Sequence, residues 1–347
     1  MNEMNRFLMA ARAISAAPSA DNSQPCRIER VGDEIEVSYR PHEGKDPFGV
    51  AGHGTLISVG AAAENLAQMC GLTTVVWRRE MDGAPYFRAR IPAAPLPGDL
   101  SHPLFARHTN RFPFTTPAPE ADLLGVLGAM TEGSARLHLA VGAPSFASLA
   151  SAARVCCHAR FCTRELHEWL MGSLRFGEEE VARGDGLDIR TVNLPPGGGL
   201  FMRFIQDWSR MALLNKVHIY RIMAQAEIQS LTNASMILSV VGSGATQDIP
   251  DAGRLMERAW IELNRRGWAV HPYYVIADQQ TRLLNGRLAS SPWELRVREA
   301  VDGVSAHLGL RQGERLHIML RVGKPTRMPV RSLRLPLAKV FGDADGV

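Results

Sequence analysis

Four prolines fall within residues 91–104 of this 347-residue chain, at Pro92, Pro95, Pro97 and Pro103. Proline lacks a backbone N–H and fixes φ, so it belongs neither in a helix interior nor in a central strand. The stretch therefore predicts a connector that divides the chain into two unequal parts, residues 1–104 and 105–347.

The order helix, strand, helix, strand is predicted on both sides of this connector, from apolar residues at helical or alternating spacing. In the first part we expect helix 4–17, a hairpin of strands 27–29 and 34–39, helix 56–70 and strand 73–78. In the second part we expect helix 122–130, strand 136–141, helices 148–170 and 200–214, strand 235–241, helix 251–266 and strands 270–275 and 316–322. Gly71 and Gly267 stand where helix C-caps are expected.

This pattern predicts an α+β protein, with a central, mostly antiparallel sheet flanked by helices and two unequal pseudo-repeats. The second repeat carries a helical insertion at about 165–230 that has no counterpart in the first. Within it, residues 182–214 include a Pro-Pro-Gly-Gly-Gly turn and are a candidate lid.

Composition excludes several classes of protein. Hydrophobic residues make up 46% and charged residues 21% of the chain, which is typical of an ordered globular protein. A net charge of +4 from 39 basic and 35 acidic residues is too even for a nucleic-acid footprint. Arg6 and Arg12 interrupt the apolar N-terminus, and no uncharged stretch is long enough for a membrane span, so we expect a cytoplasmic protein.

The five cysteines do not predict a disulfide framework in a chain of this length. Cys156, Cys157, His158 and Cys162 form a cluster, but Cys157 and Cys162 would not share a helix face. No second ligand pair follows at zinc-site spacing, so we expect no metal.

A loop at residues 17–25 offers Ser19, Asn22 and Gln24 between two prolines, Pro18 and Pro25. Primary amides both donate and accept hydrogen bonds, which suits the edge of a flat heteroaromatic ring. The alternative is a turn that only ends the preceding helix.

Two basic segments are suited to a phosphate. One contains Arg107, Thr109 and Arg111, and the other contains Arg331 and Arg334 after a tight turn expected at Gly323 to Pro325. Arginine forms charge-assisted, bidentate hydrogen bonds with phosphate oxygens. The alternative for both segments is a solvated surface.

Taken in order, these segments resemble the nitroreductase superfamily, and specifically its Acg-like branch, in which two nitroreductase-like halves are fused in one chain. The resemblance spans most of the chain and rests on five segments: 17–25, 60–72, 107–111, 252–267 and 321–336. It implies a nitroreductase-like fold and one bound FMN. The first half has the Pro-Ser-x-x-Asn loop and the second has the Arg-x-Thr-x-Arg arm, so the resemblance implies one site per chain.

The resemblance also implies roles for individual residues. The FMN phosphate would be held by Arg107, Thr109, Arg331, Ser332 and Arg334, with Arg111 either there or at the N1/O2 edge of the ring. The opposite wall would be formed by Pro18, Ser19, Asn22 and Gln24. His271 and Pro272 would lie near the flavin N5, although His271 would equally suit a buried core position. Cys26 departs from the tryptophan expected after Pro25.

The activity implied is an FMN-dependent, ping-pong oxidoreductase. NAD(P)H would pass a hydride through FMN N5 to a small-molecule acceptor such as a nitro compound, quinone or enone, with no side-chain acid or base as catalytic residue. Two alternatives stay open: a flavoprotein that sequesters FMN with little NAD(P)H turnover, and a biosynthetic flavin oxidase or desaturase. The two halves would pair within one chain as a monomer, with neither nucleic acid nor membrane as partner.

Overall fold

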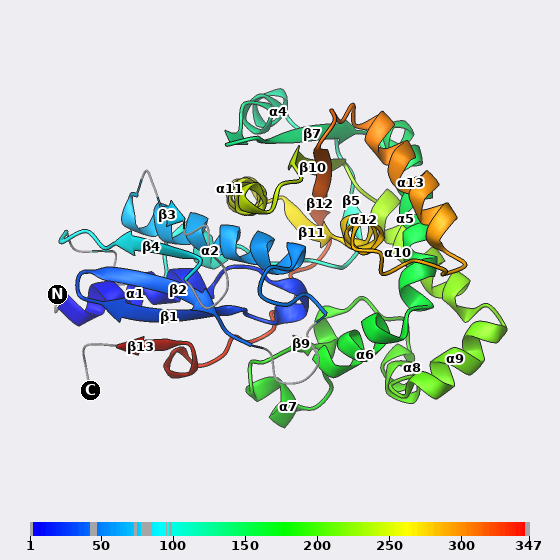
Figure 1. Ribbon diagram of the computed structural model, residues 1–347, viewed down its shortest axis with the longest axis horizontal. Helices are drawn as coiled ribbons and strands as arrows, with labels where there is room; N and C mark the ends of the chain where they lie inside the picture. Colours follow the sequence, from blue (N-terminus) through cyan, green and yellow to red (C-terminus); the bar gives the residue numbers. More distant parts are fainter. Residues whose placement is uncertain are drawn as a thin grey trace.

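The computed structural model describes residues 3–41, 47–72, 75–77, 85–94, 96 and 99–343, and it contains two main sheets with helices between and around them (Figure 1). Nearly all strand pairs in these two sheets are antiparallel; the parallel pair joins β1 to β13. The α+β class predicted from the sequence is confirmed.

The first sheet has the strand order β13-β1-β2-β4-β3. The predicted hairpin is present, and its turn contains Gly32 at φ 62°. The strands are β1 (Cys26–Val31), β2 (Glu34–Tyr39), β3 (Val76–Trp77), β4 (Phe87–Arg90) and β13 (Phe341–Asp343). Of the strand expected at 73–78, residues 73, 74 and 78 lie outside the described residues. The first helix, α1 (Glu3–Ser15), packs against β1 and the central helix α2.

The second sheet has the order β11-β12-β10-β7-β6, and β5 pairs with the end of β12. Strands β10 and β12 lie inside this sheet, which explains why their residues are almost continuously buried. The strands are β5 (Phe114–Thr115), β6 (Thr131–Glu132), β7 (Ala135–Val141), β10 (Met236–Ser243), β11 (Ala269–Tyr273) and β12 (Glu314–Pro325).

The tight turn expected at Gly323 to Pro325 is wrong, because β12 runs through both residues. Gly323 is needed there for packing. A Cβ on Gly323 would lie 2.7 Å from Cβ of Phe114, on the neighbouring strand β5. Pro325 is tolerated because it stands at the end of its strand.

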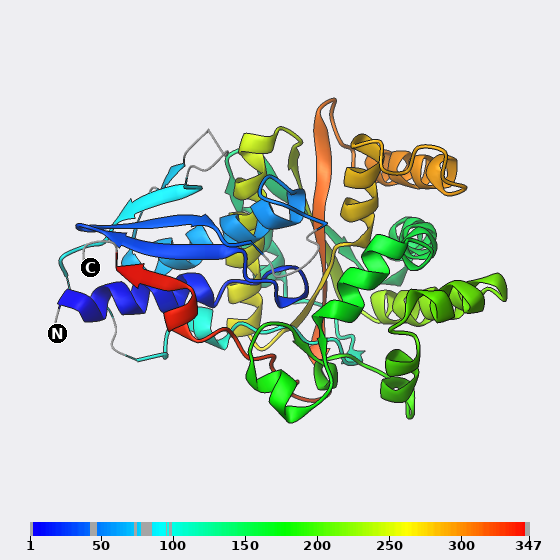
Figure 2. The same ribbon diagram turned by 60° about the horizontal axis from the view of Figure 1, so that its bottom comes forward.

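Two long helices, α2 (His53–Cys70) and α11 (Ile249–Arg265), cross between the sheets (Figure 2). They approach through Gly60 and Gly253, where a side chain would collide with the opposite backbone. Both helices end as predicted, with Gly71 and Gly267 in left-handed conformation. The core that surrounds this crossing contains residues from both sheets.

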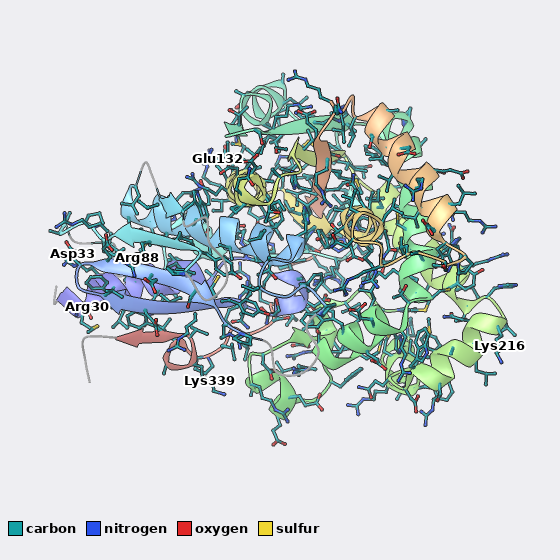
Figure 3. The ribbon with its side chains drawn as sticks, in the orientation of Figure 1. Arg30, Asp33, Arg88, Glu132, Lys216 and Lys339 are labelled. Atoms are coloured by element: carbon teal, nitrogen blue, oxygen red, sulfur yellow. The ribbon has the colours of Figure 1, made fainter. Side chains whose placement is uncertain are left out.

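An ionic cluster fastens the outer side of the crossing. Glu64 of α2 is buried and lies 2.8 Å from Arg258 and 3.3 Å from Arg254, both on α11. The same two arginines also pair with Glu132 of β6, which Figure 3 labels beside α11. Removing one member would leave buried charge uncompensated, so the cluster makes the α2–α11 contact specific.

A buried chain of hydrogen bonds also links α2 to the second sheet. Nδ1 of His53 lies 2.7 Å from the Tyr274 hydroxyl, and Nε2 of His53 lies 3.0 Å from Nδ1 of His317 in β12. Burial lowers the pKa of His53 well below its usual value and that of His317 to about 3; Arg315 nearby acts in the same direction. Both imidazoles are therefore neutral at neutral pH.

The remaining helices cover the second sheet and extend from it (Figures 1 and 2). They are α3 (Pro103–Ala106), α4 (Ala121–Gly128), α5 (Ala147–Phe161), α6 (Arg164–Ser173), α7 (Glu178–Ala182), α8 (Gly198–Phe204), α9 (Trp208–Lys216), α10 (Ile219–Thr232), α12 (Val275–Leu284) and α13 (Glu294–His307), with a small parallel pair β8 (Leu174–Arg175) and β9 (Leu187–Asp188). The single helices expected at 148–170 and 200–214 are each two helices, because the chain turns at 162–163 and at 205–207. No helix in the described part of the chain is both long and apolar enough to cross a lipid bilayer.

Candidate functional site

The arm 107–111 follows α3 and is fixed along one face of α11. His108 is held by its backbone: its N–H donates to Oδ1 of Asn264 (2.8 Å), and its carbonyl accepts from Nε1 of Trp260 (3.0 Å). Thr109 then forms a parallel β-bridge with Val270 of β11. Glu257, Trp260 and Asn264 lie three and four residues apart, so all three project from the same side of the helix.

Arg107 is a buried residue of the arm, with only 6% of its side chain exposed. Its Nε lies 2.8 Å from Oε1 of Glu257, and its guanidinium stacks 4.7 Å from the Trp260 ring centroid. Its Nη2 donates to the carbonyl of Ala16, 2.7 Å away and directly before the loop that contains residues 18–24. The arm and the loop, which lie on different sides of the Pro-rich connector, therefore meet at Arg107.

The C-terminal segment 331–335 joins the same place. Arg331 donates to the carbonyls of Phe105 and Ala106, at 2.9 and 2.7 Å, directly before Arg107. Arg334 donates to Oδ1 of Asn22 and, at 3.3 Å, to the carbonyl of Ala16. Arg107 and Arg334 thus share one carbonyl, and three segments far apart in the sequence meet at this place.

Positive charge is in excess at this junction. The pKa of Arg334 is lowered to about 9, first by burial and then by the neighbouring Arg107, against the opposing effect of Glu257. Arg331 has a lowered pKa for the same two reasons. Against these three guanidinium groups stands the carboxylate of Glu257, whose pKa is raised to about 7, chiefly by burial. An anion bound here would relieve the repulsion among the arginines.

The loop 18–24 has a strained backbone. Three of its residues that are not glycine have positive φ: Asp21 at 46°, Asn22 at 63° and Gln24 at 51°. Such conformations are uncommon outside glycine and concentrate at functional sites. Within the loop, Oγ of Ser19 accepts the N–H of Gln24 at 2.9 Å. Ser19 follows Pro18, so the proline precedes a turn that is closed by this bond.

The side-chain amides of the loop bind two neighbouring segments. Nδ2 of Asn22 donates to the carbonyls of Gly186 (2.8 Å) and Leu333 (2.9 Å). Nε2 of Gln24 donates to the carbonyl of Gly184 (2.8 Å), and its Oε1 accepts the N–H of Leu335 (2.9 Å). These bonds fasten both the insertion and the C-terminal segment to the loop.

The insertion is attached at two further points. Ser332 accepts a hydrogen bond from the N–H of Asp188, at 3.0 Å. Arg111, at the far end of the arm, lies 3.5 Å from Oγ1 of Thr191. Residues 184–191 therefore contact the loop, the arm and the C-terminal segment, which places part of the predicted lid directly over the junction.

Arg111 has a different environment from Arg107. It is half-buried, and desolvation of its guanidinium lowers its pKa; its charged neighbours are Asp21, Glu227 and Arg160. Arg111 also lies near His271. The pKa of His271 is lowered well below its usual value, chiefly by burial and further by the charges of Arg321 and Arg111. Nδ1 of His271 has no hydrogen-bond partner among the described residues. His271 and Pro272 both belong to β11, the strand along which the arm lies.

Sequence reasoning missed the roles of Glu257, Trp260 and Asn264 in positioning the arm. The available signal was their spacing, because a carboxylate and an amide share the buried face of helix 251–266. The cysteine cluster has ordinary interior contacts: Cys157 lies 3.3 Å from the Tyr273 hydroxyl, and burial raises its pKa well above the usual value. A thiol in that environment is not activated.

No family model matches the chain, and no curated protein matches it. Among solved structures it is similar to an FMN-dependent nitroreductase from Mycobacterium smegmatis in complex with NADPH, at 14% identity and TM-score 0.38, over 70% of this chain and 97% of that one. It is also similar to a nitroreductase with bound FMN from Bacteroides fragilis, at 10% identity and TM-score 0.36, over 72% and 97% of the two chains. A nitroreductase-like family protein from Bacillus cereus has 15% identity and TM-score 0.35, again over 72% and 97%.

Proposed function

We propose that this protein is an FMN-dependent oxidoreductase of nitroreductase type, with FMN held between the loop 18–24 and the arm 107–111. The observation that carries the proposal is the convergence of three arginines at one junction: Arg107 and Arg334 share the carbonyl of Ala16, and Arg331 binds the residue before Arg107. The carboxylate beside Arg107 is the buried Glu257. A phosphate dianion would balance the surplus charge, and guanidinium groups match phosphate geometry.

The arrangement of the arm supports a direction for the cofactor. Arg107, Arg331 and Arg334 would hold the phosphate, with the hydroxyls of Thr109 and Ser332 as neutral partners. Arg111 and His271, at the other end of the arm, would lie along the ring, with Arg111 at its N1/O2 edge. The buried Nδ1 of His271, which has no hydrogen-bond partner among the described residues, is a polar group suited to such a partner. Pro272, Pro18 and Ser19 would complete the walls.

When bound, FMN supplies two-electron transfer between NAD(P)H and a small-molecule acceptor such as a nitro compound, quinone or enone. The chain's own residues bind and orient it, and its arginines offset negative charge on the ring and phosphate. Two of the three similar structures named above are described with these groups: one has bound FMN, and the other is an FMN-dependent enzyme in complex with NADPH.

A second candidate is an FMN-sequestering protein of the Acg-like kind. It is favoured by the bonds of residues 184–191 to the loop, the arm and the C-terminal segment. A segment held at several points would exclude a nicotinamide cofactor from the flavin.

We further propose that residues 1–104 and 105–347 are two fused halves that share one FMN. The reciprocal approach of Gly60 and Gly253 supports this pairing. Residues 130–134, which stand in the second half where a flavin loop would be expected, form instead the β6–β7 hairpin with Gly133 at its turn. One FMN per chain follows from the proposal.

The test is anaerobic stopped-flow mixing of the FMN-loaded protein with NADH or NADPH. Loss of the flavin absorbance band at a saturable rate supports the oxidoreductase. A flavin that stays oxidised sinks the oxidoreductase and favours sequestration. A protein that cannot be loaded with FMN refutes both, and two FMN per chain refutes the shared site.

A further inference from the structure

Glu257 is a fully buried carboxylate that faces the proposed phosphate site. None of its side chain is exposed, and Oε1 lies 2.8 Å from Nε of Arg107. Neither of its oxygens has a hydrogen bond of good geometry in the described part of the chain. The negative charge of this group is therefore balanced mainly by Arg107.

Three charged groups in the described part of the chain act on Glu257. Arg107 comes from the arm, Arg334 from the C-terminal segment and Glu64 from α2, where Asn65 is the polar neighbour. Burial raises the pKa of Glu257 to about 7; the two arginines and Asn65 oppose this shift, and Glu64 adds to it. Near neutral pH, small changes in local charge decide whether this carboxyl holds a proton.

A phosphate dianion at Arg107 would be such a change. It would compete with Glu257 for one guanidinium and bring two further negative charges close to a buried carboxylate. Like charges at a shared site cannot all stay ionised in a medium that screens them poorly, so one group takes up a proton. The buried carboxyl is the group that water stabilises least.

We propose, on the basis of the proposed function, that Glu257 couples phosphate binding to proton uptake: it balances Arg107 in the protein alone and is protonated from solvent when the FMN phosphate binds beside that guanidinium. Glu257 is in this sense a positioning residue for Arg107, and it never has to touch the flavin. Riboflavin, which has no phosphate, would bind without proton uptake by Glu257.

The coupling has a definite sign. Below pH 7 Glu257 already holds a proton and FMN binds without repulsion; above pH 7 binding requires a proton from solvent, so FMN affinity falls by up to about tenfold per pH unit. The second ionisation of a phosphate ester, near pH 6, acts in the opposite direction at lower pH. We therefore expect the affinity to be highest close to neutral pH.

The experiment is fluorescence titration of the flavin-free protein with FMN between pH 6.5 and 8.5, with calorimetry at pH 8 in two buffers of different ionisation enthalpy. Wild type should lose affinity above pH 7 and take up protons at pH 8. Glu257→Gln, a neutral mimic of the protonated carboxyl, should give a nearly flat profile between pH 6.5 and 8, no proton uptake and tighter binding than wild type at pH 8. Above pH 8 Arg334, whose pKa is about 9, begins to lose its proton in both proteins. A merely structural role would instead weaken binding at every pH.

Glu262→Gln, on the same helix but in a partly exposed pair with Arg265 and Arg266, is the control and should behave like wild type. Riboflavin should show no pH dependence in this range. A wild-type FMN affinity that is constant above pH 7, with no proton uptake, overturns the inference while leaving the proposed function intact. The calorimetry needs wild type alone, so the result stands even where a variant fails to fold. Absence of FMN binding at any pH overturns the proposed function itself.

Discussion

Gly60 of α2 and Gly253 of α11 approach one another reciprocally. A Cβ on Gly60 would lie 2.0 Å from the carbonyl oxygen of Pro250, and a Cβ on Gly253 would lie 2.2 Å from that of Ile57. Each glycine thus meets the residue three positions before the other, which is the pattern of contacts across a twofold axis. This relation is the strongest structural argument for the proposed pair of fused halves.

Gly60→Ala should destabilise the protein by about 3 kcal/mol or more, because the added methyl group meets backbone and the two helices must separate. Urea unfolding would measure the change. Gly303→Ala, in an exposed part of α13 with nothing within 4 Å of the added Cβ, is the matched control and should stabilise by about 0.5 to 1 kcal/mol. Equal effects of the two changes would contradict the close crossing.

Arg331→Ala should raise the FMN dissociation constant by about 10- to 100-fold, since a charge-assisted hydrogen bond contributes about 1.5 to 3 kcal/mol. Arg331 is exposed and donates to backbone carbonyls, so the thermal midpoint of the flavin-free protein should change little. Riboflavin affinity should not change. Arg298→Ala, at an exposed ion pair on α13, is the control. An equal loss of riboflavin affinity would place Arg331 away from the phosphate.

Acid should destabilise the protein through His53 and His317. Their folded pKa values are lowered, so the unfolded chain takes up more protons once the pH falls below about 6.5, the usual value for histidine. The contribution of these two neutral imidazoles to the free energy of unfolding is complete above that pH and is lost toward pH 3. Each histidine contributes a slope of about 1.4 kcal/mol per pH unit.

The check is urea unfolding at several pH values between 7 and 4.5, in wild type and in the double variant His53→Phe/His317→Leu. The double variant keeps the other titrating groups, so its free energy of unfolding should fall less steeply with acid than that of wild type. Parallel pH profiles would mean that these imidazoles titrate alike in the folded and unfolded protein, which contradicts the lowered pKa values.

Gly184→Ala should loosen the segment that covers the site. Gly184 has φ 70°, and a Cβ there would lie 2.2 Å from the carbonyl oxygen of Arg334. We expect faster proteolysis within 183–191 and faster reduction of bound FMN by NADPH. Gly309→Ala has a similar φ of 59° with nothing within 4 Å, so it carries the same backbone strain without the collision. If both variants are cleaved and reduced like wild type, residues 184–191 do not act as a lid.

Much of the fold could be predicted from local patterns. Helices α1, α2 and α11 have long apolar faces, and Gly71 and Gly267 mark two of their ends by adopting a conformation that other residues avoid. The convergence of Arg107 with Arg331 and Arg334 was expected only through the family resemblance, since no local rule links positions more than two hundred residues apart.

Other features depended on tertiary contacts. The side-chain amides of Asn22 and Gln24 bind backbone groups of distant segments. An amide is equally suited to hydrogen bonds with a backbone group or with the edge of a ring, so its partner cannot be read from the sequence. The contact of these two residues with flavin stays a prediction. Gly323 signals a turn in isolation but serves the packing of Phe114. In the sequence Glu257 is an ordinary helix carboxylate, and only the fold shows that it lies beside Arg107.

Strand β13 has a consequence for how the protein is made. Ile28 of β1 pairs with Phe341, so the outer edge of the first sheet stays uncovered on the ribosome until the C-terminal segment emerges. At 5 to 20 residues per second this interval is roughly 15 to 60 s. An uncovered strand edge invites pairing with other chains, so nascent copies on one messenger expose the six-residue edge of β1, which the short strand β13 covers in the finished protein.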